Sequence, residues 1–292
     1  MKKFSKYNIF KLLMIFFVSI IFFFMIYMSK KICVNVSGYI SKLEFELMLL
    51  VFKIMFIIVF PVLMLVFFIV YYYRHSNTSE KYTPNWKHSY FLEIICWLIP
   101  IFIISFLAFL SWNTTHSLEP SKKLKVNINK PITIEVVSLN WRWLFIYPYY
   151  KIATINEISF PKNVPVNFKI TSNSVMNSFF IPNLGSQIYT MAGMKTELNL
   201  IALSNGIYKG ISSNYSGNGF SNMKFKVYVQ NDLFHFNKWI KKVKSKKKFL
   251  SFKKQFLNLS KNSKKYKNEY FSYTDPLLFY KIIKIFNSCH NT

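Results

Sequence analysis

Residues that could ligate a metal or act as nucleophiles are few in this 292-residue chain, and they lie far apart. Cys33, Cys96 and Cys289 form no CxxC or similar pair, so their spacing predicts neither a disulfide framework nor a thiolate metal cluster. The five histidines also lack close companions: His75, His88, His116, His235 and His290. We therefore expect surface histidines, the last three in loops or the tail, and no histidine metal or nucleophile site.

The elements that could hold these residues in place begin with long apolar runs. Three such runs lie in the first 112 positions. Residues 47–73 carry one charge, Lys53, and residues 91–112 carry one, Glu93. A span of roughly 30 Å of hydrocarbon needs about 20 helical residues, so both runs predict membrane helices, whereas the first run, residues 12–28, is marginal. Pro61 and Pro100 interrupt the two long runs. A membrane helix tolerates proline when neighbouring helices or side chains satisfy the freed carbonyls, so both predicted helices are expected to pack against a larger helical partner.

The placement of basic residues predicts the orientation of these helices. Lysines precede the first run, and Arg74, Lys81 and Lys87 lie between the second and the third, so everything after Trp112 is expected to be exported. The first run also resembles a secretory signal, and Cys33 is a lipidation candidate. However, Lys30 and Lys31 before it match a lipobox poorly. Residues 1–33 are therefore either signal-like or a retained helix, and the retained helix is the simpler hypothesis.

From about residue 122 to residue 231 the hydrophobic pattern changes to period two, which is typical of strands with one buried face. Examples are ITIEVVSLNW and MKFKVYV, and Pro and Gly separate the strand-like runs. Many short strands of this kind predict an all-β sandwich or small barrel. A nucleotide-binding α/β fold is not expected, because the sequence has no Gly-rich phosphate loop.

The C-terminal stretch, residues 232–292, is rich in lysine and aromatic residues. Helical spacing of Trp239 with Val243, and of Phe252 with Phe256 and Leu259, predicts one or two basic amphipathic helices. They could lie on an anionic membrane or pack their aromatic face on the sandwich, and we favour packing. The chain has 38 Lys+Arg against 11 Asp+Glu, but only Arg74 and Arg142 are arginines, so base composition of the genome explains the excess more simply than nucleic-acid binding.

The segments EVVSLNWRWLFIYP, TSNSVMNSFFIPNLGSQIYTMAGM and GIYKGISSNYSGNGFSNMKFKV closely resemble subunit II of the haem-copper respiratory oxidases, specifically the bo-type ubiquinol oxidases. KYTPNWKHS and SWNTTHSLEPS extend the resemblance over most of the chain. The resemblance implies a hairpin of two membrane helices, a cupredoxin-like sandwich on the periplasmic face, and a partner subunit I that holds the haems and a further copper.

The family divides by whether this sandwich holds a binuclear copper centre. In its cytochrome c oxidase branch, two cysteines in CxExC, two histidines, a methionine sulfur and a glutamate carbonyl bind the copper pair. Asn177 stands at the first histidine position. The remaining positions are Ser212 and Ser216 at the two cysteines, Asn214 at the glutamate, Phe220 at the second histidine and Met223 at the methionine.

Redox copper prefers thiolate and imidazole donors, and these residues supply neither. We therefore expect no metal on this chain, with Met223 as a core residue and Trp141 and Trp143 as packing or interface aromatics. Glu93 matches a glutamate that the resemblance associates with proton entry into subunit I. An equally simple hypothesis is a water-exposed charge favourably placed near a helix N-terminus.

These observations predict the non-catalytic subunit II of a proton-pumping ubiquinol oxidase that reduces oxygen to water. It would lie in a bacterial inner membrane with its large C-terminal domain in the periplasm. The expected partners are subunit I, the other oxidase subunits and the lipid bilayer, with no nucleic acid and no cytochrome c. A copper-carrying subunit II is disfavoured because no cysteine lies between Cys96 and Cys289. A membrane-tethered periplasmic binding or assembly protein with a basic tail is the alternative.

Overall fold

A computed structural model describes Tyr27 and residues 36–74, 88–122, 131–251, 255–260 and 268–289. Among these, the residues up to Phe45 and those after Lys122 form one compact unit, and those from Glu46 to Lys122 form another. Cys33 and almost all of the first apolar run lie outside the described residues, so the hypotheses about the N-terminus stay predictions.

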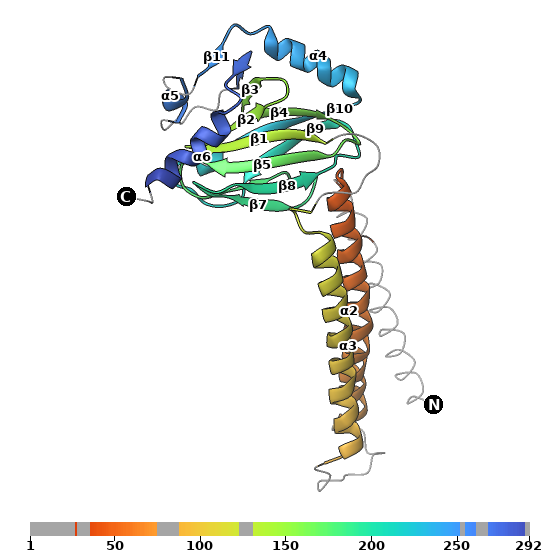
Figure 1. Ribbon diagram of the computed structural model, residues 1–292. Helices are drawn as coiled ribbons and strands as arrows, with labels where there is room; N and C mark the ends of the chain where they lie inside the picture. Colours follow the sequence, from red (N-terminus) through yellow and green to blue (C-terminus); the bar gives the residue numbers. More distant parts are fainter. Residues whose placement is uncertain are drawn as a thin grey trace. The chain divides into compact units, whose positions relative to one another are not determined.

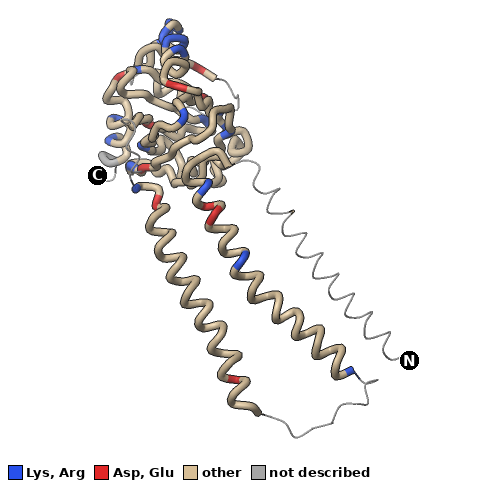
Figure 2. Tube along the Cα trace, turned by 90° about the vertical axis from the view of Figure 1, so that its right-hand side faces the viewer, with Lys and Arg blue, Asp and Glu red and all other residues tan. Residues whose placement is uncertain are grey.

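Two long helices carry the second and third apolar runs. Helix α2 spans Tyr39–Tyr72 with 34 residues, and α3 spans Tyr90–Ser117 with 28 residues. Both are long and apolar enough to cross a bilayer. Figure 2 shows how few charged residues the two helices carry. No described residue of α3 is buried, and large apolar side chains such as Ile57, Trp97 and Phe102 are exposed, so these helices need lipid or a partner to cover them.

The rest of the described chain is mainly a β-sandwich (Figure 1). Within the described residues, a six-stranded sheet has the order β12-β3-β2-β1-β5-β8 and a five-stranded sheet the order β4-β10-β9-β6-β7. The first sheet consists of β1 (Ile132–Leu139), β2 (Arg142–Tyr147), β3 (Ile152–Ile155), β5 (Val166–Ser172), β8 (Thr196–Leu200) and β12 (Glu269–Phe271). The second consists of β4 (Glu157–Pro161), β6 (Asn177–Phe180), β7 (Gln187–Thr190), β9 (Gly206–Ser212) and β10 (Lys224–Gln230).

The pairing of strands explains the period-two pattern of the sequence. β1 pairs with β5 in parallel and with β2 antiparallel, and β10 pairs with β4 in parallel and with β9 antiparallel. Alternate side chains therefore point between the sheets, where Trp143, Phe145, Phe168, Phe179 and Phe225 are fully buried. The rings of Phe179 and Phe225 stack with centroids 5.1 Å apart. The predicted sandwich is confirmed.

The residues after β10 cover outer surfaces of the sandwich. Helix α4 (Leu233–Lys244) contacts β4, β10 and β12, and it buries Phe236, Ile240 and Val243 while its lysines face outward. The expected packing of a basic amphipathic helix on the sandwich is confirmed for α4. Helices α5 (Leu257–Ser260) and α6 (Leu278–Cys289) follow, and β11 (Phe249–Leu250) pairs with β13 (Tyr273–Thr274).

A second apolar core joins α6 to the outer face of the six-stranded sheet (Figure 1). Leu278, Phe279 and Ile282 of α6 pack with Val137 and Leu139 of β1 and with apolar residues of β2 and β3. The sequence predicted a helical extension, but the structure adds strand β12 to the edge of the sheet, where Glu269 is paired with Ile155. The three residues of this strand are too few to show a period-two pattern.

The start of α2 belongs to the same compact unit as the sandwich. Ser41 Oγ donates a hydrogen bond to the Asn183 carbonyl over 3.0 Å, and the Glu44 carboxylate accepts bonds from the Ser186 amide and hydroxyl at 3.3 and 3.1 Å. Gly185 has φ +88°, and a Cβ atom there would lie 2.6 Å from the Ser41 amide nitrogen. A glycine is therefore required where the loop meets the first turn of the helix.

Candidate functional site

The positions of the family's copper ligands gather at one end of β6 and β9. Asn177 begins β6, Ser212 ends β9, and Met223 comes directly before β10. The strands are neighbours, since Phe179 is paired with Ser212. The turn between β9 and β10 carries the remaining positions: Asn214, Ser216 and Phe220.

A neutral hydrogen-bond network occupies the centre of this end. Asn177 donates through its side-chain amide to Ser138 Oγ over 2.8 Å and to the Val175 carbonyl over 3.1 Å. Its side-chain oxygen accepts a bond from Ser212 Oγ over 3.2 Å. Asn177 and Ser212 are 1% and 4% exposed, so these bonds satisfy polar groups that water cannot reach.

The other four positions make further contacts, and the carbonyls of Asn214 and Met223 bond Ser212. Asn214 donates its side-chain amide to the Met176 carbonyl over 3.3 Å, and the Ser216 carbonyl accepts a bond from the Trp141 indole over 3.0 Å. The Phe220 ring lies against Tyr215 with centroids 5.7 Å apart. Met223 is 1% exposed, which fits the core role expected for it, and its carbonyl accepts a bond from the Ser212 amide over 3.1 Å.

Trp141 closes this end of the sandwich from the β1–β2 turn. It has φ +60°, an uncommon conformation for a bulky residue. A Cβ atom on Gly219 would lie 2.1 Å from Cδ2 of the Trp141 ring, so only glycine lets the indole seat on the turn. Trp143 is fully buried in the core, with its ring centroid 5.4 Å from that of Phe179. Both aromatics are thus in packing positions, as the sequence suggested.

The donor set of this end does not fit a redox copper pair. Such a centre needs thiolate and imidazole ligands, whereas the side chains here are amides, hydroxyls, a phenyl ring and one thioether. The Ser212 hydroxyl donates its proton to Asn177, and the Asn177 amide is held by Ser138 and Val175. No group of three or more His, Cys, Asp or Glu side chains suited to a metal occurs in the described ranges.

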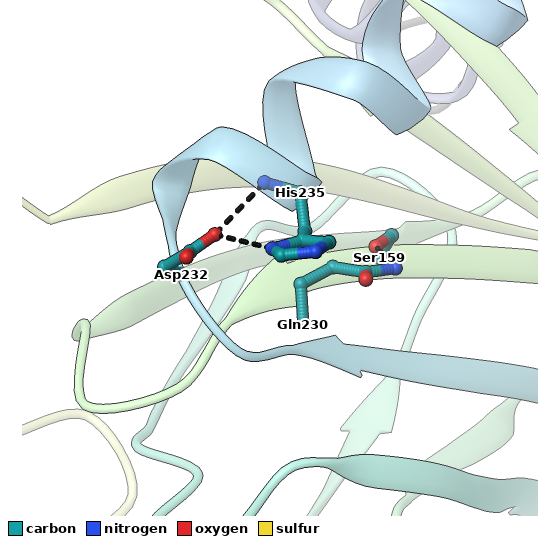
Figure 3. A network of polar contacts seen from close by, with 4 residues as sticks. All are labelled: Ser159, Gln230, Asp232 and His235. Carbon is teal, nitrogen blue, oxygen red and sulfur yellow. Dashed lines mark hydrogen bonds and ion pairs between the residues drawn. The ribbon is translucent and has the colours of Figure 1, made fainter.

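A histidine and a carboxylate do meet at the start of α4 (Figure 3). His235 Nδ1 lies 2.7 Å from Asp232 Oδ1, which also accepts the His235 backbone amide over 2.9 Å. The latter bond is the main reason why the pKa of Asp232 lies below its ordinary value. The arrangement is a helix N-cap, with Asp232 extended before the first turn.

The buried Ser159 beside this pair is not part of a nucleophilic triad. Its hydroxyl donates to the Tyr228 carbonyl over 3.0 Å and accepts the Gln230 side-chain amide over 3.1 Å. Figure 3 shows Asp232 joined to His235 and Ser159 turned toward Gln230. The expectation that His116 and His235 lie in loops was wrong, because α3 continues to Ser117 and α4 begins at Leu233. Among the described residues, no hydroxyl or thiol bonds either imidazole ring, so neither histidine has a nucleophile to activate.

Glu93 lies in the first turn of α3. Its Oε1 is 3.4 Å from His88 Nδ1, and both side chains are more than half exposed. The sequence analysis did not predict the contact between His88 and Glu93. Their separation of five positions, with the start of α3 between them, could have suggested it. The position suits either a solvated helix-end charge or a proton-accepting group, so both hypotheses remain.

Comparison with known proteins fits this architecture. Residues 147–230 match the family described as the periplasmic domain of cytochrome c oxidase subunit II. The chain is 49% identical over 276 residues to the cytochrome bo(3) ubiquinol oxidase subunit 2 of Buchnera aphidicola subsp. Schizaphis graminum, covering 94% of this chain and 93% of that protein. It is 47% identical over 249 residues to the same subunit of Pseudomonas aeruginosa, covering 85% and 74%. The chain belongs to the ubiquinol oxidase subunit 2 family.

Membership of the ubiquinol oxidase subunit 2 family makes this chain a subunit of a respiratory oxidoreductase complex, with other oxidase subunits as partners. It is a membrane-anchored subunit with a periplasmic domain. The periplasmic domain of subunit II of a cytochrome oxidase from Bradyrhizobium japonicum is also similar, at 21% identity and a TM-score of 0.39 over 43% of this chain and 97% of that domain. The predicted family and fold class are confirmed.

Proposed function

We propose that this chain is the non-catalytic subunit II of a proton-pumping ubiquinol oxidase in a bacterial inner membrane, and that its sandwich carries no copper centre. Haems and copper then belong to subunit I, where ubiquinol is oxidised and oxygen is reduced to water. Ubiquinol reaches the enzyme from within the bilayer, so electrons need no metal port in the periplasmic domain and no cytochrome c.

The observation that carries this proposal is the network of Asn177, Ser138 and Ser212. Each side-chain group is buried and already bonded to a neutral partner. A metal would have to displace these bonds and would gain only hard, neutral ligands in their place. The sandwich is then a scaffold that covers and stabilises subunit I, with two apolar helices that pack in the membrane.

Metal analysis of the purified complex tests the copper part of the proposal. After subunit II is separated from the complex in detergent, we expect no stoichiometric copper on the chain and no electron paramagnetic resonance signal from a mixed-valence copper pair. A Ser212→Ala variant should retain the ubiquinol oxidase activity of the wild type per haem. Stoichiometric copper on the isolated chain, or loss of activity with intact haem content in Ser212→Ala, would overturn it.

We further propose that Glu93 takes part in proton entry to subunit I. Its exposure and its position at the start of α3 make it accessible to water. We expect Glu93→Gln to slow oxygen reduction and proton uptake in the assembled enzyme while haem content stays constant. Glu119→Gln, two residues after the end of α3, is the matched control and should leave both rates unchanged. If wild type and Glu93→Gln reduced oxygen and took up protons at equal rates, the proposal would be wrong. Glu93 would then be a water-exposed charge at the end of the helix.

The hypotheses about residues 1–33 have their own test. A retained first helix predicts an intact N-terminus, whereas processing at Cys33 predicts a mature chain that begins with a lipid-modified cysteine. Mass spectrometry of the subunit from the assembled complex distinguishes the two.

A further inference from the structure

Glu135 is a buried carboxyl with no part in the copper positions or the membrane helices. It lies in the middle of β1 on the face of the six-stranded sheet that points away from the sandwich core, and it is 3% exposed. Its neighbours on that face are Ile146 across β2 and Lys169 across β5. A charge at such a position is costly unless it is paired.

The surroundings of Glu135 are apolar on the side of the C-terminal extension. Ile146 is its cross-strand neighbour, and Val137 follows two residues later on the same face of β1. Both belong to the apolar cluster that Leu278, Phe279 and Ile282 of α6 complete. An ionised Glu135 therefore places a negative charge at the border of the interface that holds α6 on the sheet.

Two buried acceptors on neighbouring strands lack a donor. Glu135 Oε2 and Asn167 Oδ1 are both buried and have no hydrogen-bond partner among the described residues. Asn167 Nδ2 donates a hydrogen bond to Asn199 Oδ1 on β8 over 2.8 Å. Asn167 Oδ1 is therefore the acceptor end of this side chain that has no partner. Asn167 lies two residues before Lys169 on β5, so its side chain is on the same face of the sheet as Glu135. Two acceptors cannot bond each other, but a carboxyl that carries a proton is a donor.

The charged groups around Glu135 do not supply a close counter-ion. Lys169 is its cross-strand neighbour, yet no ion pair joins the two within the described ranges, and the next residue across the sheet, Glu197, is paired with Lys195 at 2.8 Å. In the part of the chain that the structure describes, Arg142 of β2 and Glu269 of β12 are the other charged groups named on this face, and α6 carries Tyr280, Lys281 and Lys284. Lys281 is paired with Asp275. A metal cation is disfavoured beside Lys169, whereas a proton is not.

We propose that Glu135 is a proton-binding site of the periplasmic domain and that its protonation strengthens the docking of α6 on the six-stranded sheet. The proton comes from solvent and returns to it, so no other group changes its covalent state. Burial raises the pKa of Glu135 from 4.5 to about 7, and Lys169 opposes this rise.

The sign of the pH dependence follows from linkage. Because the folded state holds this proton more tightly than the unfolded chain, the stabilisation is complete below pH 4.5 and is lost as the pH rises through about 7. Glutamine has the shape of the protonated acid and cannot ionise. Wild type and Glu135→Gln should therefore behave alike in acid and differ in alkali.

Hydrogen–deuterium exchange on the purified full complex tests this. Peptides from residues 278–289 are compared between wild type and Glu135→Gln at the same pH, which cancels the intrinsic pH dependence of exchange. We expect equal exchange rates near pH 4 and faster exchange in the wild type at pH 8.5. The ratio of the two rates should change between pH 4.5 and about 7, with its midpoint between these values. A ratio of one across the whole range would overturn the proposal, as would failure of Glu135→Gln to assemble in acid.

Two further variants separate this site from its neighbours. Lys169→Met removes the charge that favours ionisation, so the midpoint should move to higher pH. Glu197→Gln alters another carboxyl on the same face that already has a lysine partner, so it should leave the midpoint in place. If Glu197→Gln shifted the midpoint and Lys169→Met did not, the titrating group would not be Glu135.

Discussion

Two buried polar groupings hold this sandwich together in different ways. At the copper positions, Asn177, Ser138 and Ser212 bond one another without any charge. Beneath the C-terminal extension, the Glu157 carboxylate, 5% exposed, accepts bonds from Trp239 Nε1 at 3.3 Å, Asn268 Nδ2 at 3.1 Å and Tyr270 Oη at 2.7 Å. The first grouping joins strands of one fold, and the second joins the fold to residues that come after it.

The difference lies in what each grouping needs in order to stay buried. A neutral network is stable when every donor meets an acceptor, because an unpaired polar group is costly in the protein interior. A carboxylate needs several donors at once, because an ionised group is much more expensive to desolvate. Glu157 has three donors, whereas Glu135 Oε2 has none among the described residues, and on our proposal it takes up a proton instead.

The largest effect is expected from Glu157→Leu, which leaves the donors of Trp239, Asn268 and Tyr270 without their acceptor. Bonds to a charged group contribute about 1.5–3 kcal/mol each, and because water can replace some of them, we expect a loss of about 3 kcal/mol of unfolding free energy. Urea denaturation followed by tryptophan fluorescence measures it. Glu197→Leu is the control on the other sheet and should cost well under half as much. Equal losses would mean that the three bonds do not secure the extension.

A smaller effect is expected from Asn177→Ala, which removes the amide that bonds the Ser138 hydroxyl. It leaves Ser212 Oγ with only its longer contacts, at 3.3 Å to the Asn214 carbonyl and 3.5 Å from the Ser178 amide. The expected loss is about 2 kcal/mol, because the missing bonds are neutral and a small cavity remains. Thermal unfolding of the detergent-solubilised chain measures it, with Asn218→Ala, an exposed position of the nearby turn, as control. Ubiquinol oxidase activity per assembled complex should not change. A loss no greater than that of Asn218→Ala would show that the network does not stabilise the fold.

The sequence predicted the parts of this fold that have a strong period. The apolar runs gave α2 and α3, and the alternation in ITIEVVSLNW gave β1, because burial of one face imposes these patterns. The resemblance to the oxidase family assigned the copper positions, and it could do so because Ser212, Asn214 and Ser216 have the spacing of the CxExC motif. Strand β12 was missed, since its pairing with β3 is a tertiary contact between residues more than 100 positions apart.

The polar contacts were mostly beyond sequence reasoning. Glu157 stands in a strand pattern like any other polar residue, and its three donors come from α4 and from the segment around β12. Glu135 alternates with apolar residues as a solvent-facing glutamate would, and only the cover over that face of the sheet makes it a buried acid. Alternation reports which face a side chain occupies, and it does not report whether a later segment covers that face.

The smallest effect is expected at the start of α4, where Asp232 caps the helix on an exposed surface. Asp232→Ala removes the acceptor of the His235 amide, so the thermal midpoint should fall slightly, whereas Asp232→Asn keeps a capping oxygen and should restore most of it. The folded-state pKa of Asp232 is lowered, so its contribution is present above the unfolded pKa and fades as the pH falls through the folded value. The gap between wild type and Asp232→Ala in thermal scans should therefore narrow in acid. A constant gap would mean that the charge of Asp232 adds nothing, and that α4 is held, like the rest of the extension, by its buried face and by Glu157.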